Sequence, residues 1–437
     1  MNYAFVLFST LVFSSHSFAQ VPKITEAIEE AMRTNPSIEA AEAQLKGLKA
    51  IRVGVLLNLA SVTYSRTQAF GRIQSQGLEV DGGALNSLGQ VGFTIAPAAI
   101  FAFKGLGSSI QAQKNGLIAL KQAITLELIR IWLDFYNQEG AIQSYKNFLQ
   151  ELDKLAVKVK AGQSPTKEAD YQQVLIARND MNNILNQTIQ ATELGRIDYV
   201  KVVGKDPILL PPTTPGSSEG DDDDIEKLKK TLDSVFPLPT VKEALDIAMM
   251  KNPQVLAASF MRDNAKVDLN ASRITPWLPN LTIGRGRIDT KNAFDGIPDV
   301  LTNQTSVTLS WSLSPGQIPV HQSKLSVLQS AQFSEATARR ETTASVQKAF
   351  VQLNTLNQLW ITQADSFKRA RAALLAVKDP SVNVAESLNI LRSFLAVWSG
   401  PTGFVSLTSN IFLVKASAHA QMGTLFEQIE KLKQQGQ

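Results

Sequence analysis

The chain has 437 residues, of which 44% are hydrophobic and 19% charged, and this is ample for a large core or for extended packed helices. Its 43 lysines and arginines against 39 acidic residues give a formal net charge of +4. This charge is small and dispersed, which argues against nucleic-acid binding. The absence of cysteine excludes disulfides, thiolate metal sites, cysteine nucleophiles and a lipid anchor on cysteine.

Residues 1–19, MNYAFVLFSTLVFSSHSFA, form an apolar stretch that predicts a secretory signal peptide. Ser17 and Ala19 are the small residues that suit signal peptidase, so the mature chain is expected to start at Gln20. The segment contains no Lys or Arg, and a buried amino-terminal helix is the alternative interpretation. No later apolar run approaches the ~18 residues that a spanning helix needs, so any membrane crossing must use strands.

The helix start at Asn35-Pro36 recurs at Asn252-Pro253. Residues 24–36, ITEAIEEAMRTNP, and 241–253, VKEALDIAMMKNP, are identical at six of thirteen positions. Asparagine is a favourable N-cap and proline suits the first helical position, so each pair predicts a helix start. The duplication predicts two halves with the same order of elements, residues 20–203 and 240–437.

Two short alternating segments follow the first helices of each half. Strands are expected at about 60–70 and 90–103, and again at about 279–290 and 303–313. Apolar or aromatic residues alternate there with small polar ones, as in strands with lipid on one side and water on the other. A half-buried soluble sheet gives the same alternation, so the strands alone leave both interpretations open. The candidates for lipid-facing residues are Val91, Phe93, Ile95, Val307, Leu309, Trp311 and Leu313.

A long helix is expected after each strand pair, at about 104–160 and 318–378. Apolar residues repeat there every seven positions, which predicts coiled-coil packing: Ile110, Leu117, Ile124 and Ile131 in the first helix, and Val346, Leu353, Trp360 and Phe367 in the second. Each long helix is expected to break, near Gly162 and near Ser381, and to return toward Gly204 and Gly423.

The segment between the halves, residues 204–239, predicts an exposed linker because it is rich in proline and glycine. It includes the acidic run Asp221–Asp224, for which solvated charge is the usual interpretation. In the second half, WSGPTGF (398–404) interrupts the returning helix and has no counterpart in the first half.

The sequence contains no recognisable catalytic constellation. His321 and His419 are the only histidines beyond residue 19, and they lie in different helices with no cysteine available, so no transition-metal site is expected. Phosphate-loop, nucleophile-elbow and His-Glu-x-x-His patterns are absent. We therefore expect no enzyme activity, no catalytic residue, no metal and no cofactor.

The order of these elements resembles the TolC-type outer-membrane efflux channel family. The strongest segments are EEAMRTNPSIEAAEAQL, LDIAMMKNPQVLAAS, VKAGQSPTKEADYQQVLIARNDMNNIL and the MGTL near the end. The resemblance implies a mainly α fold with a small β part: a long coiled-coil helical barrel plus four transmembrane strands per subunit. It also implies two internal repeats and a trimer whose strands together form one twelve-stranded barrel.

The same resemblance implies a function. The subunit would belong to a homotrimeric duct in the outer membrane, with a periplasmic helical tunnel, that exports small molecules or proteins in efflux or type I secretion. Its partners would be a periplasmic adaptor (membrane fusion) protein, an inner-membrane transporter and outer-membrane lipid. The alternative is a periplasmic coiled-coil structural or adaptor-like protein whose strands form a soluble sheet.

In this family the helix turns at the periplasmic end carry the closing contacts and meet the adaptor. The matching positions here are Gly162, Glu168 and Asp170 in the first half, and Asp379, Ser381, Glu386, Ser387 and Asn389 in the second. Ser387 and Asn389 stand where family members often have aspartates, so an acidic ring would be thinner than usual. Glu168 and Asp170 also suit an exposed first helical turn, where the helix dipole favours acids.

Three arginines, Arg66, Arg285 and Arg287, interrupt the alternation of the strands. An arginine that faces lipid costs about 2–4 kcal/mol at the membrane midplane and little near the interface. We therefore expect these arginines at an end of a strand, or a shift of the strand register at their positions.

Overall fold

The structure is a computed structural model that describes most of the chain. Residues 1–19, for which a signal peptide is predicted, and the acidic run Asp221–Asp224 lie outside the described residues. The described residues are 21–57, 59–75, 78–161, 167–207, 229–230, 232–290, 300–311, 316–376, 383–399 and 403–435.

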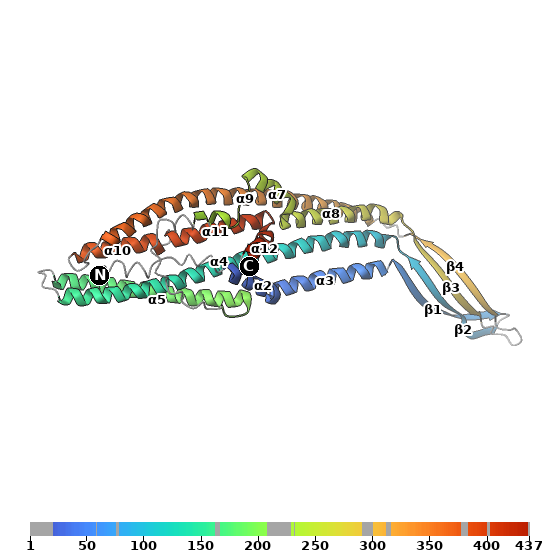
Figure 1. Cartoon of the computed structure of the whole chain (residues 1–437). Helices are drawn as coiled ribbons and strands as arrows, with labels where there is room; N and C mark the ends of the chain where they lie inside the picture. Colours follow the sequence, from blue (N-terminus) through green and yellow to red (C-terminus); the bar gives the residue numbers. More distant parts are fainter. Residues whose placement is uncertain are drawn as a thin grey trace. The chain divides into compact units, whose positions relative to one another are not determined.

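Each half of the chain contains two helices, a strand pair, a long helix and a returning helical segment, in that order (Figure 1). The first half contains α2 (Val21–Thr34), α3 (Pro36–Leu57), β1 (Ala60–Ser75), β2 (Leu78–Ile95), α4 (Ala98–Ala161) and α5 (Lys167–Val203). The second half contains α7 (Val241–Lys251), α8 (Pro253–Ile274), the short 3-10 turn η2 (Thr275–Trp277), β3 (Asn280–Thr290), β4 (Val300–Ser310), α9 (Gln317–Ala376), α10 (Val384–Ser399), α11 (Phe404–Gln421) and α12 (Leu425–Gln435). Two helices, α10 and α11, thus stand where the first half has α5 alone.

The prediction of a strand at residues 90–103 is wrong for residues 98–103, because helix α4 already begins at Ala98. Pro97 explains the change: its fixed φ suits a helix start, and its carbonyl accepts a hydrogen bond from the Ile100 N–H at 3.1 Å. The apolar run 98–103 fits a buried helix as well as a strand, so alternation alone misassigns it. Strand β2 also begins earlier than expected, at Leu78.

The remaining elements end close to the expected positions. The long helices cover 98–161 and 317–376, and the second strand pair covers 280–290 and 300–310. Strand β4 ends at Ser310, so Trp311 follows the strand instead of lying in it. The helix break in the second half is present as the interval between α10 and α11.

The chain divides into two compact units, and each takes segments from both halves of the sequence. The first unit contains 1–40, 117–253 and 339–437, and the second contains 41–116 and 254–338. Because the order of elements is repeated, each unit collects the same kinds of elements from the two halves. The first unit is helical among its described residues, and the second contains the sheet.

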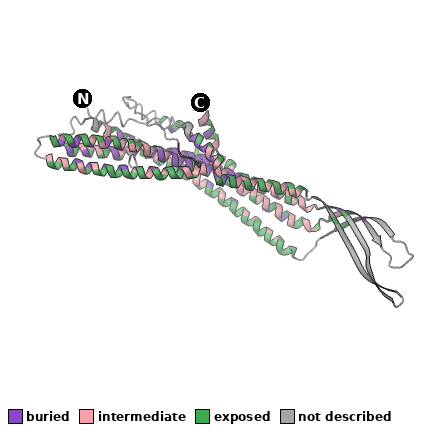
Figure 2. Ribbon diagram, turned by 90° about the horizontal axis from the view of Figure 1, so that it is seen from below, coloured by how far each residue is buried: buried purple, intermediate pink, exposed green. Residues whose placement is uncertain are grey.

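The heptad residues of the long helices form the core of the first unit. Leu117 and Ile131 of α4 are buried, and so are Trp360 and Phe367 of α9. Figure 2 shows the pattern, with buried residues (purple) gathered on one side of a helix and exposed residues (green) on the other. The seven-residue repeat therefore marks packed helix faces, as the sequence predicts.

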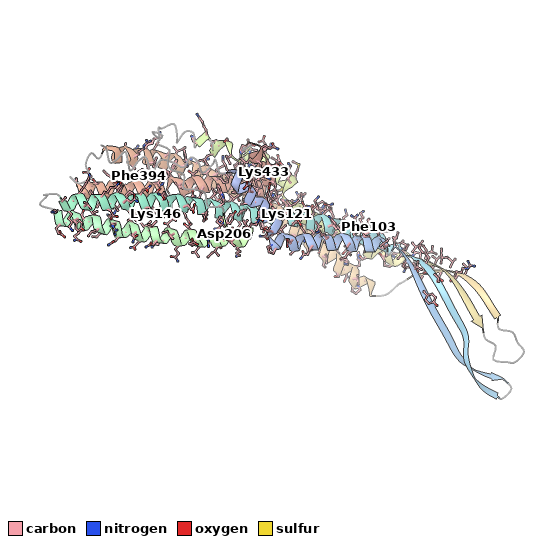
Figure 3. All side chains as sticks on the ribbon, turned by 60° about the horizontal axis from the view of Figure 1, so that its bottom comes forward. Phe103, Lys121, Lys146, Asp206, Phe394 and Lys433 are labelled. Atoms are coloured by element: carbon pink, nitrogen blue, oxygen red, sulfur yellow. The ribbon has the colours of Figure 1, made fainter. Side chains whose placement is uncertain are left out.

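Aromatic side chains join α9 to α10 and α11 in the first unit. The ring centroids of Trp360 and Phe404 are 5.0 Å apart. Those of Phe367 and Phe394, the latter labelled in Figure 3, are 5.5 Å apart. The indole Nε1 of Trp360 donates a hydrogen bond to Thr408 Oγ1 at 3.1 Å. Buried aromatic pairs of this kind add directional packing to the heptad contacts.

The second unit contains one four-stranded antiparallel sheet in the order β1-β2-β3-β4. Strands β2 and β3 pair directly, although the long helices α4 and α5 separate them in the sequence. Strands β1 and β4 are the edges of this sheet (Figure 1). The sheet therefore joins the strand pair of each half through its central strands.

Polar contacts connect the helices of the second unit. Arg262 Nη1 of α8 donates to Glu335 Oε2 of α9 at 2.7 Å, and Lys324 Nζ of α9 lies 3.1 Å from Asp268 Oδ2 of α8. The Arg52 guanidinium of α3 lies over the ring of Phe103, which belongs to α4 and is labelled in Figure 3, at 4.2 Å from the ring centroid. These contacts connect α8 with α9 and α3 with α4.

Candidate functional site

One face of the sheet is apolar and exposed across all four strands. Val62, Phe93, Ile283 and Val307 stand opposite one another in register, one on each strand. Their exposed fractions are 73%, 42%, 43% and 66%. Residues directly opposite in neighbouring antiparallel strands share a face, so the four side chains form one apolar row. A contiguous exposed apolar surface indicates contact with a membrane or with another protein.

The opposite face carries small and hydroxyl side chains. Gly92 and Gly284 are buried and stand opposite one another. Thr94 and Thr282 are also opposite, with their hydroxyl oxygens 3.1 Å apart in a hydrogen bond. The two faces thus differ in the manner that the alternating sequence predicts.

Exposed apolar side chains continue from the strands onto the helix ends of the same unit. Trp277 and Trp311 flank the strand pair β3–β4 on its helix side and are 71% and 55% exposed. Leu57, Ile100 and Ile318, at the adjoining ends of α3, α4 and α9, are exposed as well. Tryptophan at the edge of an apolar surface is typical of a membrane–water interface.

Five of the seven lipid-facing candidates are exposed in the structure: Val91, Phe93, Val307, Leu309 and Trp311. Ile95 is half-buried at the helix end of β2. Leu313 lies outside the described residues. The set missed Val62, Tyr64 and Ile283, which are also exposed, although the alternation of residues 61–70 and 280–288 carries the signal that would have found them.

The expectation that the arginines lie at strand ends is wrong for Arg285. It is the sixth residue of the eleven-residue strand β3 and stands opposite Val91 and Thr305. Strand β3 pairs with β2 and β4 without a register shift, whereas β1 and β2 shift only at Ala69 to Gly71, beyond Arg66. Arg285 is exposed and shares the face of Ile283. Arg285 therefore lies in the middle of β3, on the same face as the apolar row.

The helix-turn candidates gather at one end of the first unit. Glu168 and Asp170 occupy the first turn of α5, and Glu386 occupies the first turn of α10. One hydrophobic cluster joins the end of α4 to these two helix starts, through Val159, Val174 and Val384 among others. Figure 1 shows that α5 and α10 begin at the same end of the bundle. Packing thus brings candidates from both halves of the sequence to the same end of the bundle.

The side chains of these candidates mostly make local contacts. Glu168 is exposed and accepts a hydrogen bond from Gln172 at 2.9 Å. Glu386 accepts one from the Asn383 side chain at 2.7 Å, and its own N–H donates to Asn383 Oδ1 at 3.3 Å. Asn383 therefore caps α10, a partner that the sequence pattern did not reveal. Ser387 is half-buried and Asn389 exposed, while Gly162, Asp379 and Ser381 lie outside the described residues.

The repeated Asn-Pro pairs have a second role besides starting a helix. Asn35 Oδ1 accepts a hydrogen bond from the Ser37 N–H at 3.0 Å, which confirms the predicted N-cap. The Asn35 side chain also donates to Val202 O at 3.2 Å, and the Asn252 side chain donates to Gln421 O at 2.7 Å. Both carbonyls belong to the last turn of a returning helix, so each asparagine joins the beginning of a half to its end.

Each returning helix ends at a glycine in the left-handed region, beside the asparagine of its half. Gly204 has φ +80° and Gly423 has φ +74°. Such a residue terminates a helix and lets the chain turn sharply, which favours glycine. The same combination of Asn-Pro start and glycine end occurs in both halves, which explains why these short motifs are duplicated in the sequence.

Asn252→Asp is expected to destabilise the fold by about 1–3 kcal/mol, because the ionised carboxylate cannot donate to the Gln421 carbonyl and leaves it without this buried partner. Asn35→Asp is the matched control in the first half, where the bond is longer and the asparagine is 9% exposed against 2% for Asn252. The thermal unfolding midpoint of each variant measures the difference. Equal midpoints for the two variants would contradict the stronger role of Asn252.

The end of the linker is held by two buried residues of α11. Lys415 Nζ donates to Leu232 O at 2.5 Å and to Val235 O at 3.3 Å. Burial lowers the pKa of Lys415, and nearby Asp233 acts in the opposite direction. The two carbonyls lie at the end of a short helical turn, where a cation is favoured. Lys415 thus connects the end of the linker to α11.

His419 lies one helical turn beyond Lys415 and is 2% exposed. Its Nδ1 forms a 2.9 Å hydrogen bond with Thr424 Oγ1, and its ring lies 5.8 Å from that of Phe236. Burial lowers the pKa of His419 to about 4. The backbone of Phe236 and Pro237 favours the charged ring, but Nε2 forms no hydrogen bond of normal geometry among the described residues, so desolvation prevails.

Among the described residues, no group of three or more His, Asp or Glu side chains is placed to hold a metal ion. No helix in the described ranges combines the length and the hydropathy needed to cross a membrane.

No family model matches the sequence, and a comparison with curated proteins finds no match either. Solved structures do match in fold. The chain is similar to the CmeC outer membrane channel of Campylobacter jejuni, with a TM-score of 0.68 and 10% identity over 95% of this chain and 89% of that one. It is similar to the open state of the Neisseria gonorrhoeae MtrE outer membrane channel (TM-score 0.67, 15% identity, 92% and 90% covered).

The outer membrane protein VceC from Vibrio cholerae is also similar, with a TM-score of 0.64 and 15% identity over 92% of this chain and 96% of that one. In all three comparisons nearly the whole of both chains is covered. The fold is therefore the mainly α fold with a small β part that these outer-membrane proteins share, as the resemblance to TolC-type channels predicts.

Proposed function

We propose that this chain is a subunit of an outer-membrane channel that exports small molecules or proteins to the outside of the cell. The observation that carries the proposal is the exposed apolar row across all four strands, opposite a face of small and hydroxyl residues. Strands of this kind face lipid on one side and water on the other. The shared fold supports the same function, since the similar structures are outer-membrane channels.

The proposal includes a homotrimer, because the sheet has two edges. Strands β1 and β4 each have a neighbour on one side only. Edge strands expose unpaired backbone groups, which lipid cannot satisfy. Pairing β1 of one subunit with β4 of the next removes both edges, and three subunits with four strands each form a closed twelve-stranded barrel of ordinary size.

The proposal also includes the orientation of the subunit in the cell envelope, which follows from the positions of the strands and of the helix turns. The signal peptide directs the chain out of the cytoplasm, the strands lie in the outer membrane, and the helices extend into the periplasm. The helix-turn end then meets a periplasmic adaptor protein and, through it, an inner-membrane transporter. Glu168, Asp170 and Glu386, with Gly162, Asp379, Ser381, Ser387 and Asn389, are the residues proposed for the entrance and the adaptor contact.

A pair of substitutions on β4 distinguishes a lipid-facing sheet from a soluble one. Val307→Lys places a charge in the apolar row and is expected to cost about 2–4 kcal/mol in the membrane, lowering the amount recovered in outer membranes. Thr308→Lys is the matched control on the opposite face, where the charge meets water. Both positions are exposed, so a soluble sheet would accept the two substitutions equally well.

The wild-type protein provides the direct test. It is expected to sediment with outer membranes, to migrate on gels as a trimer unless heated, and to give stepwise conductance in planar bilayers. Recovery of the unaltered chain as a soluble monomer without conductance would contradict the proposal, as would equal recovery of the two lysine variants in the membrane fraction.

A further inference from the structure

We propose that Arg285, together with Arg66 and Arg287, forms a binding site for the phosphate group of an anionic membrane lipid. The site lies on the lipid-facing side of the sheet, where the apolar rows end. This inference rests on the proposed function, because it requires that the apolar face contact a bilayer.

The apolar face changes character abruptly along the strands. The row of Val62, Phe93, Ile283 and Val307 is apolar on every strand. The next row on the same face, farther from the helices, contains Tyr64, Val91, Arg285 and Thr305. The row after that contains Arg66, Gly89, Arg287 and Asn303, with no apolar side chain. The boundary between apolar and basic rows therefore runs through Arg285.

The backbone register places the three arginines around one glycine. Arg66 and Arg287 both stand opposite Gly89, on the two strands that flank it. Their Cα positions are therefore two strand spacings apart, about 10 Å, and Arg285 is two residues from Arg287, about 7 Å along the strand. Gly89 contributes no side chain to the space between them. The backbone therefore brings three arginine positions together on one face of the sheet.

The chemistry of arginine fits a lipid phosphate at this depth. A guanidinium group binds phosphate oxygens through two parallel hydrogen bonds, and its aliphatic stem can remain among acyl chains. Asp289 lies in the following row of the same face, so three positive charges stand against one negative charge there. An arginine in the acyl region costs about 2–4 kcal/mol, and this cost falls at the headgroups, where phosphate is available. The ligand is therefore the headgroup of a lipid in the leaflet away from the helices.

The experiment measures the lipids that contact the full-length protein. The purified chain is reconstituted into phosphatidylcholine vesicles, and spin-labelled phosphatidylglycerol and phosphatidylcholine are compared at the protein surface by electron spin resonance. Wild-type protein is expected to prefer phosphatidylglycerol. Since a basic residue near a membrane surface contributes about 1 kcal/mol toward an anionic lipid, Arg285→Gln is expected to lower the preference about 5-fold. Arg66→Gln/Arg285→Gln/Arg287→Gln is expected to abolish it.

Arg340→Gln, on an exposed position of α9 within the first unit, is the matched control and should leave the preference unchanged. Heat-modifiable migration shows that each variant remains assembled, and Arg285→Gln alone carries the test if the triple variant does not assemble. Inorganic phosphate should reduce the preference no more than chloride at equal ionic strength. Selective competition by inorganic phosphate would identify a free anion as the ligand and overturn the lipid site.

The outcomes separate this inference from the proposed function. A wild-type protein that inserts and conducts but contacts both lipids equally overturns the arginine site and leaves the channel intact. A preference that survives in the triple variant overturns the site as well. Failure of the wild-type chain to insert into the phosphatidylcholine vesicles overturns both proposals.

Discussion

Gly423→Ala is expected to destabilise the protein by at least about 4 kcal/mol, a cost that exceeds most single substitutions. Gly423 has φ +74°, where a residue with a Cβ is strained by about 1–2 kcal/mol. A Cβ at this position would also lie 2.2 Å from the carbonyl oxygen of Lys251 and 2.6 Å from its carbonyl carbon. These are backbone atoms, so a side-chain rotation cannot relieve the clash. Movement of Lys251 would also disturb Asn252 and its hydrogen bond to Gln421.

Gly204→Ala is the matched control, because Gly204 occupies the corresponding position in the first half. Its φ is +80°, but among the described residues an added Cβ would meet only Thr34 Oγ1 within 4 Å, at an ordinary contact distance of 3.7 Å. The cost should therefore be about 1–2 kcal/mol, from the backbone conformation alone. Circular dichroism at the helix band during thermal unfolding in detergent compares the two variants. Similar midpoints for both would show that the close approach at Lys251 is not important for stability.

Acidification from above pH 6.5 to about pH 4 is expected to remove about 3 kcal/mol of stability through His419 alone. Burial lowers the pKa of His419 in the folded state from 6.5 to about 4. As the pH falls through 6.5, the unfolded chain therefore takes up a proton while the folded chain does not, and unfolding is favoured. Below about pH 4 both states are protonated and this contribution stops changing.

The charged neighbours of His419 support the same direction. Lys415 on α11 and Lys431 on α12 both disfavour a second positive charge at this place. Carboxylates titrate in the lower part of the same pH range, so the measurement must be a difference between two proteins. Urea unfolding of wild type and His419→Asn from pH 7.5 to 4 provides it. The variant should lose the part of the pH dependence that His419 contributes, and parallel curves for the two proteins would contradict the assignment.

Periodicity carried the correct information about the long elements. The seven-residue repeats of α4 and α9 predicted packed helices, and residues such as Ile131 and Phe367 are buried as expected. Alternation predicted the two faces of the strands, including the exposure of Val307 and Leu309. Both signals are local, because each side chain's direction follows from its place in a regular element.

The strand prediction was wrong where the sequence was compatible with both a strand and a helix. Residues 98–103 form a continuous apolar run that suits a strand as well as a helix, yet Pro97 begins a helix and the segment continues into α4. The position of Arg285 was missed for a related reason. An argument from membrane cost placed the arginine at a strand end, whereas pairing with β2 and β4 fixes it in the middle of β3. Strand pairing joins residues that are far apart in the sequence, so a short stretch of sequence cannot predict it.

The sequence by itself determined the duplicated order of elements, the helix starts at Asn35-Pro36 and Asn252-Pro253, and which residues of each helix or strand share a face. Tertiary structure decided which ends meet: Asn252 with Gln421, Lys415 with the linker end at Leu232, and β2 with β3. These partners are far apart in the chain, and their contacts depend on how the packed helices close each half. The physical reason is that periodicity fixes the direction of a side chain, while only packing fixes what it meets.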